Sequence, residues 1–456
     1  MQINPNIFKT YDIRGIYEED FDEEMAYSLG KTYVDLRKRE MPEKKLSIVV
    51  ARDMRGSSKT LKKSLIKGLI ESGVDVIDIG LSSTPTFYFA VANFNYDGGI
   101  IITASHNPKQ WNGFKLVREK AIPISKDTGI DILRDKISNV GTRHGACLLG
   151  EIIELEDVLK TQINHDLKFA DIKKIKPLKI AVDTANGMGA QYIEELFKHL
   201  PCELIKINFE LDGNFPAHEA DPIKEKNLLD IKTKVLEEKA DLGIAIDGDG
   251  DRVFFIDENG NTIDQSIIRG VLAMLFLEEK PGSKICYDIR PGRITRDLIE
   301  ENNGIPIITK VGHSLIKEQM IKEDAYFAGE SSGHFFLNMD IGCFEIPVII
   351  ILKLLQEFSK GGKKISEYIR PYQKYFHSGE INSSVDLEYE QIFKRVIGAF
   401  PYGKINRLDG ITIEYPDFWL NVRGSNTENK LRLNLEAKTK KLMEEKRDEV
   451  LDVIRG

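Results

Sequence analysis

The sequence predicts an α/β protein in which three tandem related α/β domains, with mixed and largely parallel sheets, precede a smaller C-terminal α+β domain. Its 456 residues are too many for one hydrophobic core. Three segments repeat the pattern of a strand, a turn and an amphipathic helix, and the part from about Tyr368 onward does not follow it. We therefore expect domains at 1–150, 151–254, 255–367 and 368–456.

The repeated pattern opens each time with a β-branched run and a polar or glycine-containing turn. The three runs are Lys45–Asp53, Leu178–Gly187 and Lys284–Gly292. Helical spacing of apolar residues follows each run, at Leu61, Leu65, Ile66 and Leu69, at Ile193, Leu196, Phe197 and Leu200, and at Ile294, Leu298 and Ile299. Strand, crossover helix and strand make a parallel sheet covered by helices. The repeats start more than 100 residues apart, which is too far for a solenoid and indicates separate related domains.

The last part of the chain predicts a different fold. A helix is expected at Tyr389–Ala399, a strand at Phe418–Val422 and a final helix at Lys438–Ile454. Residues Leu431–Glu436 alternate strictly between apolar and polar, as in an antiparallel strand with one face in water. The domain should therefore be α+β.

Composition narrows the class of partner and the compartment. The net charge of −8 gives no overall basic field for nucleic acid or anionic lipid. The four cysteines show neither zinc-site spacing nor a disulfide pattern. The longest apolar run, Ile346–Leu352, is far too short to cross a bilayer, and Met1–Tyr11 has no signal-peptide core. We expect a soluble cytoplasmic protein, a monomer or homodimer, without nucleic-acid or membrane partners.

The segment Thr103–Pro108 offers a hydroxyl at the end of a predicted strand, Gly98–Ile102. A serine in an Asn-Pro turn most often only bonds the backbone. The residues that follow Ser105 are unusually rich in donors, namely His106, Asn107, Lys109, Asn112 and Lys115. Such a cluster around a serine suits a phosphate.

The segment Asp247–Arg252 offers a metal site at the end of another predicted strand, Leu242–Ile246. Asp247, Asp249 and Asp251 are hard oxygen ligands that suit Mg²⁺. A calcium loop is excluded because Arg252 stands where that loop needs glycine. A solvated acidic turn is disfavoured because carboxylates this close repel each other. A phosphatase in which Asp247 attacks phosphorus stays open.

Two further loops contain groups that suit sugars and anions. Gly329–His334 combines a carboxylate, hydroxyls and an imidazole, which can bracket vicinal hydroxyls, although such a hexapeptide alone is most often an ordinary loop. Arg423–Glu428 combines an arginine, hydroxyls and an amide in a turn, which suits an anion. The alternative for the second loop is a hairpin turn with a surface arginine.

These loops together resemble the α-D-phosphohexomutase superfamily, most closely its phosphomannomutase/phosphoglucomutase group. The motifs that carry the resemblance run in order nearly from end to end: Phe8–Gly15, Thr103–Pro108, Asp247–Arg252, Gly329–His334 and Arg423–Thr427. The resemblance implies four domains around a central cleft, the last of them TATA-box-binding-protein-like. It also implies a phosphorylated Ser105 and a Mg²⁺ held by Asp247, Asp249, Asp251 and a phosphoserine oxygen of Ser105.

The implied reaction interconverts hexose 1-phosphate and hexose 6-phosphate, of mannose or glucose, through the phosphoserine and a hexose 1,6-bisphosphate that is both intermediate and activator. The implied partners are small-molecule hexose phosphates. The expected catalytic residues are Ser105, Arg252, Lys115, Arg14 and His313. The expected substrate-binding residues are Tyr11, His106, Arg290, Glu330, Ser332, His334, Arg423, Ser425, Asn426 and Thr427.

Some positions depart from the family pattern and leave the sugar open. Lys9 replaces a common arginine, Asn429 replaces the usual proline, and Asp340–Glu345 lacks the paired aspartates common there. Tyr11-Asp12-Ile13 does not match the opening motif of phosphoglucosamine mutases, which favours hexose phosphates. Phosphoglucosamine mutase, the Asp247 phosphatase and a sugar-phosphate-binding regulatory protein without turnover remain the alternatives.

Overall fold

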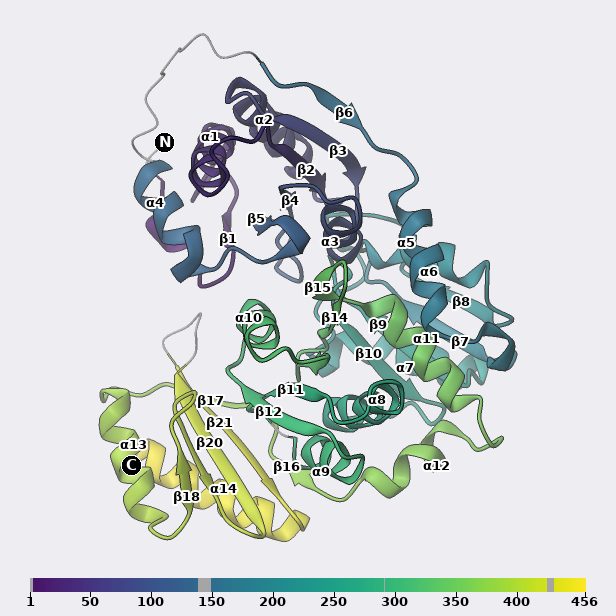
Figure 1. Ribbon diagram of the computed structural model, residues 1–456. Coiled ribbons are helices and arrows are strands. Elements are labelled where there is room, and N and C mark those ends of the chain that lie inside the picture. Colours follow the sequence, from purple (N-terminus) through teal and green to yellow (C-terminus); the bar gives the residue numbers. More distant parts are fainter. Residues whose placement is uncertain (1–2, 138–148, 291, 425–429) are drawn as a thin grey trace. The chain divides into compact units, whose positions relative to one another are not determined.

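The computed structural model describes residues 3–137, 149–290, 292–424 and 430–456 (Figure 1). The chain forms two compact units, each made of two stretches of sequence. Unit 1 comprises Met1–Ile263 and Ser332–Ser366, and unit 2 comprises Asp264–Ser331 and Glu367–Gly456. The domain boundaries and the central cleft expected from the sequence stay predictions.

The first sheet of unit 1 has the strand order β1-β5-β4-β2-β3-β6. Strands β2, β3, β4 and β6 are parallel, whereas β5 is antiparallel to both β4 and β1. The sheet is thus mixed and largely parallel, as predicted. Its strands are β1 (Ile13–Ile16), β2 (Ser47–Arg52), β3 (Asp75–Leu81), β4 (Gly98–Ile102), β5 (Trp111–Arg118) and β6 (Ile152–Glu154).

Helices cover both faces of this sheet, which explains the unbroken apolar run in β2. Ile48 and Val50 pack in one core with residues of α1 and α2. Gly99, the neighbour of Val49 across the sheet, faces α3, where a Cβ on this glycine would lie 2.6 Å from Phe87. A strand that is buried on both faces needs no polar alternation. The helices are α1 (Glu23–Glu40), α2 (Ser58–Glu71), α3 (Thr84–Asn93) and α4 (Asp131–Ile137).

The second sheet of unit 1 has the order β10-β9-β7-β8. Strand β7 is parallel to β8 and β9, and β10 is antiparallel to β9. Helix α7 packs Ile231 and Val235 against this sheet. The elements are α5 (Val158–Asp166), β7 (Lys179–Asp183), α6 (Gly189–Phe197), β8 (Glu203–Ile207), α7 (Leu229–Glu238), β9 (Leu242–Ile246) and β10 (Val253–Asp257).

The third repeat begins in unit 2, where β11 is parallel to β12 and β13. In all three repeats the first strand therefore has two later strands as parallel neighbours, as the repeated pattern predicted.

Unit 2 contains α8 (Gln265–Glu279), β11 (Lys284–Asp288), α9 (Arg293–Glu301), β12 (Ile305–Thr309), α10 (His313–Glu323) and β13 (Phe327–Gly329). Unit 1 contains the antiparallel pair β14 (Phe335–Met339) and β15 (Gly342–Glu345), then α11 (Pro347–Phe358); α12 (Ile365–Ile369) follows.

The last sheet, in unit 2, is antiparallel, with the order β16-β21-β20-β19-β18 and β17 paired to β21. Helix α13 has the predicted bounds, whereas the final helix begins two residues later than expected because the Thr439 hydroxyl accepts a hydrogen bond from the N–H of Leu442 at 3.2 Å. The elements are β16 (Phe376–His377), β17 (Ile381–Ser383), α13 (Tyr389–Ala399), β18 (Lys404–Asn406), β19 (Ile411–Glu414), β20 (Phe418–Gly424), β21 (Leu431–Ala437) and α14 (Lys440–Arg455).

The prediction of a wet face on the strand at Leu431–Glu436 is wrong. Asn434 and Glu436 are each only 1% exposed. Glu436 accepts hydrogen bonds from the indole of Trp419 at 2.6 Å and from the backbone N–H of Arg293 at 3.1 Å. A polar strand face can therefore be buried when each group finds a partner, and the alternating pattern does not reveal those partners.

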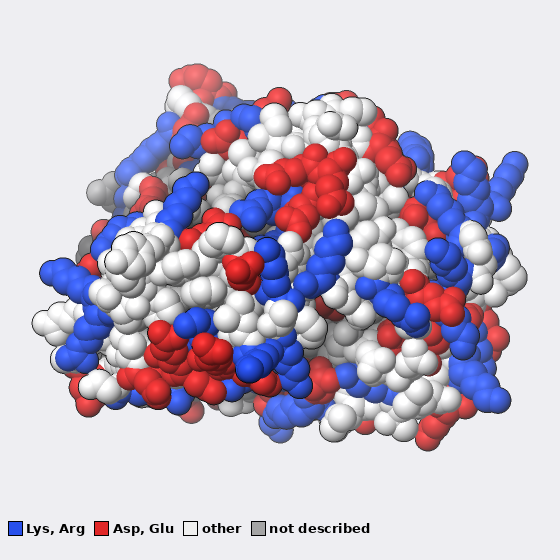
Figure 2. Space-filling view, turned by 90° about the horizontal axis from the view of Figure 1, so that it is seen from below, with Lys and Arg blue, Asp and Glu red and all other residues white. Residues whose placement is uncertain are grey.

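The surface charges and the lengths of the apolar helices agree with the predictions made from the composition. No helix of the described residues is long and apolar enough to cross a membrane, and Ile346–Leu352 lies mostly within the buried helix α11. Figure 2 shows Lys and Arg side chains interspersed with Asp and Glu on the face that it displays. This face carries no single large field of one sign.

Candidate active site

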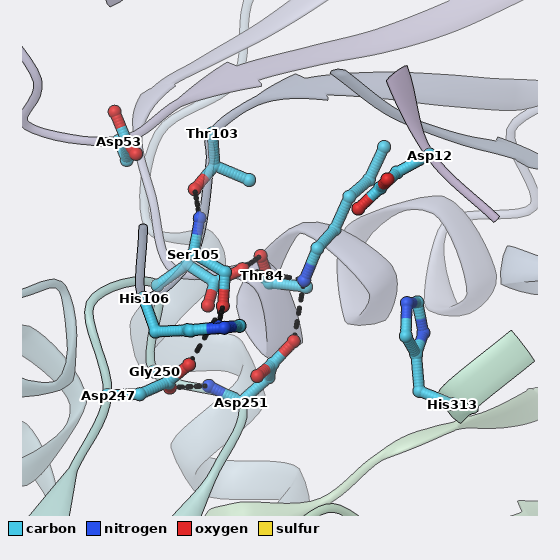
Figure 3. A network of polar contacts seen from close by, with 12 residues as sticks. Asp12, Asp53, Thr84, Thr103, Ser105, His106, Asp247, Gly250, Asp251 and His313 are labelled. Atoms are coloured by element: carbon cyan, nitrogen blue, oxygen red, sulfur yellow. Dashed lines mark hydrogen bonds and ion pairs between the residues drawn. The ribbon is translucent and has the colours of Figure 1, made fainter. Parts of the chain in front are cut away.

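Ser105 occupies a constrained turn at the carboxyl end of β4. Its φ is 51°, in the left-handed region that few residues other than glycine adopt. The turn is held by two hydrogen bonds, from the Ser105 N–H to Thr103 Oγ1 at 2.9 Å and from the Asn107 N–H to the Ala104 carbonyl at 3.0 Å. The Ser105 hydroxyl donates to Asp247 Oδ2 at 2.9 Å (Figure 3). The predicted hydroxyl and the predicted acidic loop therefore meet.

Asp247, Asp249 and Asp251 lie together at the carboxyl end of β9. All three are buried, and each offers one oxygen within 4.8 Å of the others. Asp247 Oδ1 accepts hydrogen bonds from the N–H groups of Asp251 at 3.0 Å and Arg252 at 3.1 Å. The loop can wrap this tightly because Gly250 has a φ of 79°. The backbone thus brings alternate side chains to one point.

Lys115, on β5, balances part of this negative charge. Its Nζ lies 2.6 Å from Oδ2 of Asp249 and 2.6 Å from Oδ2 of Asp251. Burial would lower the pKa of Lys115, but the two carboxylates raise it well above its usual value. Burial would raise the pKa of both aspartates, but Lys115 holds the pKa of Asp249 and of Asp251 below the usual value. Lys115 is therefore a fixed cation here.

Asp247 has the opposite environment. Burial, together with the charges of Asp251 and Asp249, raises the pKa of Asp247 well above its ordinary value. Asp249 and Asp251 share Lys115, whereas Asp247 has Arg252 Nε at 3.8 Å from its Oδ2.

The residues present fit a divalent cation. Asp249 Oδ1 is buried and has no hydrogen-bond partner within the described ranges, whereas its Oδ2 is engaged by Lys115 and by the hydroxyl of Thr84 at 2.6 Å. A buried carboxylate oxygen is normally satisfied, so an unpartnered one among three acids is available as a cation ligand. An all-oxygen donor set suits Mg²⁺.

Basic groups surround the Ser105 turn and the acidic loop. Arg14, on β1, donates from Nη1 to Asn107 Oδ1 at 2.6 Å and pairs with Asp12. Burial would lower the pKa of Arg14, but Asp12 raises it, so the guanidinium stays charged. Arg252 Nε lies 3.8 Å from Asp247 Oδ2. Both predicted arginines therefore lie with the serine and the acids.

Three more predicted residues lie in the same cluster of unit 1. His334 Nε2 lies 3.1 Å from Asp251 Oδ1, and its Nδ1 lies 2.8 Å from the hydroxyl of Ser332. His106 Nδ1 lies 3.3 Å from Ser105 Oγ. Burial and then the charges of Arg252 and Arg14 lower the pKa of His106 well below its usual value, so this imidazole is neutral.

Unit 2 holds a second set of predicted residues. Glu330 is buried and accepts hydrogen bonds at Oε1 from the N–H of Gly312 at 2.9 Å and from Arg290 Nη2 at 3.2 Å. Burial would lower the pKa of Arg290, but Asp288 and Glu330 raise it. His313 is the buried first residue of α10 and directly follows Gly312. The hexapeptide at Gly329–His334 is divided, since its residues up to Ser331 belong to unit 2 and those from Ser332 onward belong to unit 1.

Arg423 forms an arginine pair with Arg432 in the last sheet. The two residues are direct neighbours on β20 and β21. Glu380 lies between their charges, with Oε2 at 2.7 Å from Arg423 Nη2 and Oε1 at 3.1 Å from Arg432 Nη1. Arg423 is only 1% exposed and is therefore no surface arginine.

The remaining predictions are less completely described. Ser425, Asn426 and Thr427 lie outside the described residues. Tyr11 lies before β1 and is half-buried. The roles assigned to all these residues stay predictions.

Sequence reasoning missed three residues that support the site. Thr84, at the start of α3, fixes Asp249, and the Ser83-Thr84-Pro85 sequence was a visible helix-start signal. Arg55 follows β2 and bonds the Ser105 turn, and Glu380 joins the two arginines. No local pattern marks Arg55 or Glu380, because their partners are distant in sequence.

Comparison with known proteins identifies the family. Models described as phosphoglucomutase/phosphomannomutase match along most of the chain: alpha/beta/alpha domain I at residues 5–143, domain II at 158–260, domain III at 264–375 and the C-terminal domain at 381–453. A phosphomannomutase of Methanocaldococcus jannaschii is 40% identical over 98% of this chain and 97% of its own length. A phosphomannomutase of Vibrio cholerae is 38% identical over 98% of each chain.

Solved structures agree with the sequence comparison. A phosphoglucomutase/phosphomannomutase family protein of Burkholderia thailandensis superposes with a TM-score of 0.89 at 29% identity, covering 100% of this chain and 98% of the other. A phosphoglucomutase of Paramecium, at 16% identity and a TM-score of 0.77, shares the fold over 94% of this chain and 91% of its own. The chain therefore belongs to the phosphoglucomutase/phosphomannomutase family, within the superfamily that its motifs resemble.

Proposed function

We propose that this enzyme interconverts hexose 1-phosphate and hexose 6-phosphate, with mannose or glucose as the sugar. The observation that carries the proposal is the 2.9 Å hydrogen bond from the Ser105 hydroxyl to Asp247, which joins a nucleophile to a cation site. The relatives named phosphomannomutase support mannose phosphates, and the family models, described as phosphoglucomutase/phosphomannomutase, keep glucose phosphates beside them.

The reaction consists of two phosphoryl transfers that leave the enzyme unchanged. The bond between phosphorus and Ser105 Oγ breaks as the phosphoryl group passes to the free hydroxyl of the hexose phosphate. This hydroxyl gives up its proton, Ser105 Oγ takes one up, and the sugar becomes hexose 1,6-bisphosphate. The other phosphate of this bisphosphate, which the substrate brought, is then transferred to Ser105. Each cycle needs a phosphorylated Ser105. A trace of hexose 1,6-bisphosphate therefore acts as the activator, because it phosphorylates this serine.

Phosphoryl transfer needs in-line positioning and positive charge on the equatorial oxygens. Arg14, Lys115 and Arg252 supply fixed positive charge around Ser105. Asp247, Asp249 and Asp251 would hold Mg²⁺, which supplies further charge stabilisation to a phosphoryl group when bound. Neutral His106, 3.3 Å from the Ser105 hydroxyl, can accept a proton there.

Recognition of the sugar and of the second phosphate is assigned to other groups. Glu330, Ser332 and His334 would bind sugar hydroxyls, and Arg290 and Arg423 would bind the phosphate that is not reacting. His313 and Tyr11 remain candidates for proton movement and substrate contact. Mannose and glucose differ at one hydroxyl, so the preferred sugar is decided by loop geometry around these residues.

A phosphorus NMR time course tests the proposal. The substrates are mannose 1-phosphate and glucose 1-phosphate, with Mg²⁺ and a trace of hexose 1,6-bisphosphate. We expect the 6-phosphates to appear without free phosphate. Ser105→Ala should lose at least about 10³-fold in turnover, as removal of a nucleophile commonly does. Ser72→Ala is the matched control, because the Ser72 hydroxyl, just after α2, donates to the Gly68 carbonyl at 2.8 Å and contacts none of the residues assigned to the reaction.

The same experiment separates the alternatives. Release of free phosphate, with loss of activity in Asp247→Asn but not in Ser105→Ala, would support the aspartyl phosphatase instead. Conversion of glucosamine phosphate alone would support phosphoglucosamine mutase. Calorimetric binding of hexose phosphates without interconversion would support a regulatory binding protein. We further propose that the enzyme acts in the cytoplasm, as a monomer or homodimer, on small hexose phosphates.

A further inference from the structure

Arg55 makes an unusual set of contacts with the turn that holds Ser105. From Nη2 it donates to the carbonyls of Ser105 at 2.8 Å and Asn107 at 2.7 Å. From Nη1 it donates to the carbonyls of Pro108 at 2.8 Å and Trp111 at 3.0 Å. The guanidinium thus binds four carbonyl oxygens between Ser105 and Trp111, the first residue of β5.

The fifth donor of Arg55 is also used, so the side chain itself is fixed. Its Nε donates to Asp53 Oδ2 at 3.2 Å, and Asp53 Oδ1 accepts from the Arg55 N–H at 3.0 Å and from the Ser58 hydroxyl at 2.6 Å. The ring of Phe215 lies over the guanidinium, 4.9 Å from Cζ. Arg55 is only 1% exposed. An arginine has five donors in a planar fork, and here every nitrogen has a partner.

These contacts fix the orientation of the peptide that follows Ser105. The carbonyl and the N–H of a trans peptide point in opposite directions. Since the Ser105 carbonyl faces Arg55, the His106 N–H points away from Arg55. Within the described parts of the chain, this N–H has no hydrogen-bond acceptor. Ser105 also keeps its left-handed φ of 51°, a conformation that persists only when its surroundings enforce it.

We propose that Arg55 is a positioning residue for phosphoryl transfer: it holds the Ser105 turn in the conformation in which the hydroxyl reaches Asp247 and the His106 N–H is presented to the phosphoryl group. This inference rests on the proposed phosphoserine function. Arg55 touches only backbone carbonyls of the turn and acts through Ser105. A lysine keeps the charge but cannot bond four carbonyls in one plane.

The test compares Arg55→Lys with Arg37→Lys in the full-length enzyme. Arg37 is the matched control because it lies in the same unit and is equally buried, at 1% exposed. It donates to the Asp97 carbonyl at 2.9 Å and does not contact the Ser105 turn. Three quantities are measured below the melting temperature of each variant. They are kcat, KM for the hexose 1-phosphate, and the single-turnover rate at which hexose 1,6-bisphosphate phosphorylates Ser105, followed by intact mass.

We expect Arg55→Lys to lower kcat and the phosphorylation rate together by at least about tenfold, with KM changed by less than about threefold, as for an interaction expressed in the transition state. Arg37→Lys should keep all three values within about threefold while it loses thermal stability. A fall of equal size in both variants would show a general loss of packing and would overturn the proposal.

A second variant keeps the proposal testable if Arg55→Lys does not fold. Asp53→Asn is nearly isosteric and loosens Arg55 without removing any bond to the turn, so a smaller fall of about threefold to tenfold in both rates is expected. Wild-type rates in either folded variant would overturn the role of Arg55. If the wild-type enzyme itself never gains a phosphoryl group on Ser105, the proposed function fails, which is a distinct outcome.

Discussion

Asp249 is the residue whose environment most clearly requires a cation. Its Oδ2 is held by Lys115 and Thr84, while its buried Oδ1 has no hydrogen-bond partner among the described residues. Asp247 and Asp251 lie beside it, so three buried carboxyl groups share the positive charges of Lys115 and Arg252. A buried charge without compensation is costly, and binding of a divalent ion removes that cost.

Removing the Asp249 carboxylate should therefore separate cation binding from folding. We expect Asp249→Asn to abolish the rise in melting temperature that Mg²⁺ gives the wild-type enzyme, since ligand binding stabilises the folded state. Turnover should fall at least about 100-fold, in line with the loss of a metal ligand. Differential scanning fluorimetry with and without Mg²⁺ measures the first effect. Asp230→Asn, at an exposed position in the first turn of α7, should keep both properties.

His218 carries a pH dependence that is separate from the acidic cluster. Its Nε2 lies 3.0 Å from Asp183 Oδ2, and its Nδ1 lies 2.9 Å from the Glu219 carbonyl. Both partners are acceptors, so the ring satisfies both only as an imidazolium. Burial would lower the pKa of His218, but the hydrogen bond and charge of Asp183 outweigh it and raise this pKa above its usual value.

A raised pKa in the folded state fixes the sign of the effect. The stabilisation is fully present below the unfolded value, about 6.5, and is lost as the pH rises through the folded value. We expect the wild-type melting temperature to exceed that of His218→Gln most clearly below about pH 6.5, with the difference shrinking toward pH 9. His199→Gln, at an exposed position, should show no such trend. A difference that grows with pH would contradict the imidazolium.

The predictability of single residues follows the range of their contacts. Ser105 and Asp247 could be predicted because each sits in a short motif whose chemistry is local. Glu380 could not be predicted, because its partners Arg423 and Arg432 become neighbours only when β20 pairs with β21. Ion pairs between distant residues leave no pattern in the sequence of either one.

Three loops in unit 1 pack backbone against backbone. A Cβ on Gly187, in the loop after β7, would lie 2.7 Å from the Gly248 carbonyl oxygen. A Cβ on Gly248, in the acidic loop, would lie 2.4 Å from the Ser105 carbonyl oxygen. Both glycines are needed because only hydrogen fits between the loops. The ends of β7, β9 and β4 therefore set the position of the serine together.

Adding one methyl group at Gly248 should disturb chemistry as well as stability. We expect Gly248→Ala to lower the free energy of unfolding by about 1–3 kcal/mol, as in overpacked cores, and to lower kcat because the displaced group is the backbone of Ser105. Urea denaturation and steady-state kinetics measure the two effects. Gly56→Ala is the control, since a Cβ there meets nothing within 4 Å, and it should change stability by no more than about 0.5 kcal/mol. Wild-type kcat in Gly248→Ala would contradict the close packing of the loops.

Elements with a strong local pattern were predictable almost to the residue. Strands β4 and β9 and helix α13 have the bounds that the apolar runs and helical spacing indicate. The prediction of an exposed face failed at β21, because its polar residues Asn434 and Glu436 are buried against partners from other parts of the chain. Alternation reports which residues share a face, whereas the exposure of that face depends on what packs there.

On the scale of the molecule, the two units carry different parts of the proposed chemistry. The groups assigned to phosphoryl transfer, Ser105, Asp247, Asp249 and Lys115, all belong to unit 1. The groups assigned to the second phosphate, Arg290 and Arg423, belong to unit 2. The three-plus-one fold could be predicted because each repeat has its own pattern. The division at Ser331 could not, because it depends on long-range packing.

This division predicts that substrate binding and cation binding can be lost separately. Glu330 is buried in unit 2, where its Oε1 lies 3.2 Å from Arg290 Nη2, and a hydrogen bond to a charged group contributes about 1.5–3 kcal/mol. Glu330→Gln should therefore raise KM for the hexose phosphate by about tenfold or more, while Mg²⁺ still raises its melting temperature as in the wild-type enzyme. Asp249→Asn should show the reverse, with the Mg²⁺ effect lost and hexose-phosphate binding retained in calorimetry. Loss of the Mg²⁺ effect in Glu330→Gln would mean that the two units do not divide the chemistry in this way.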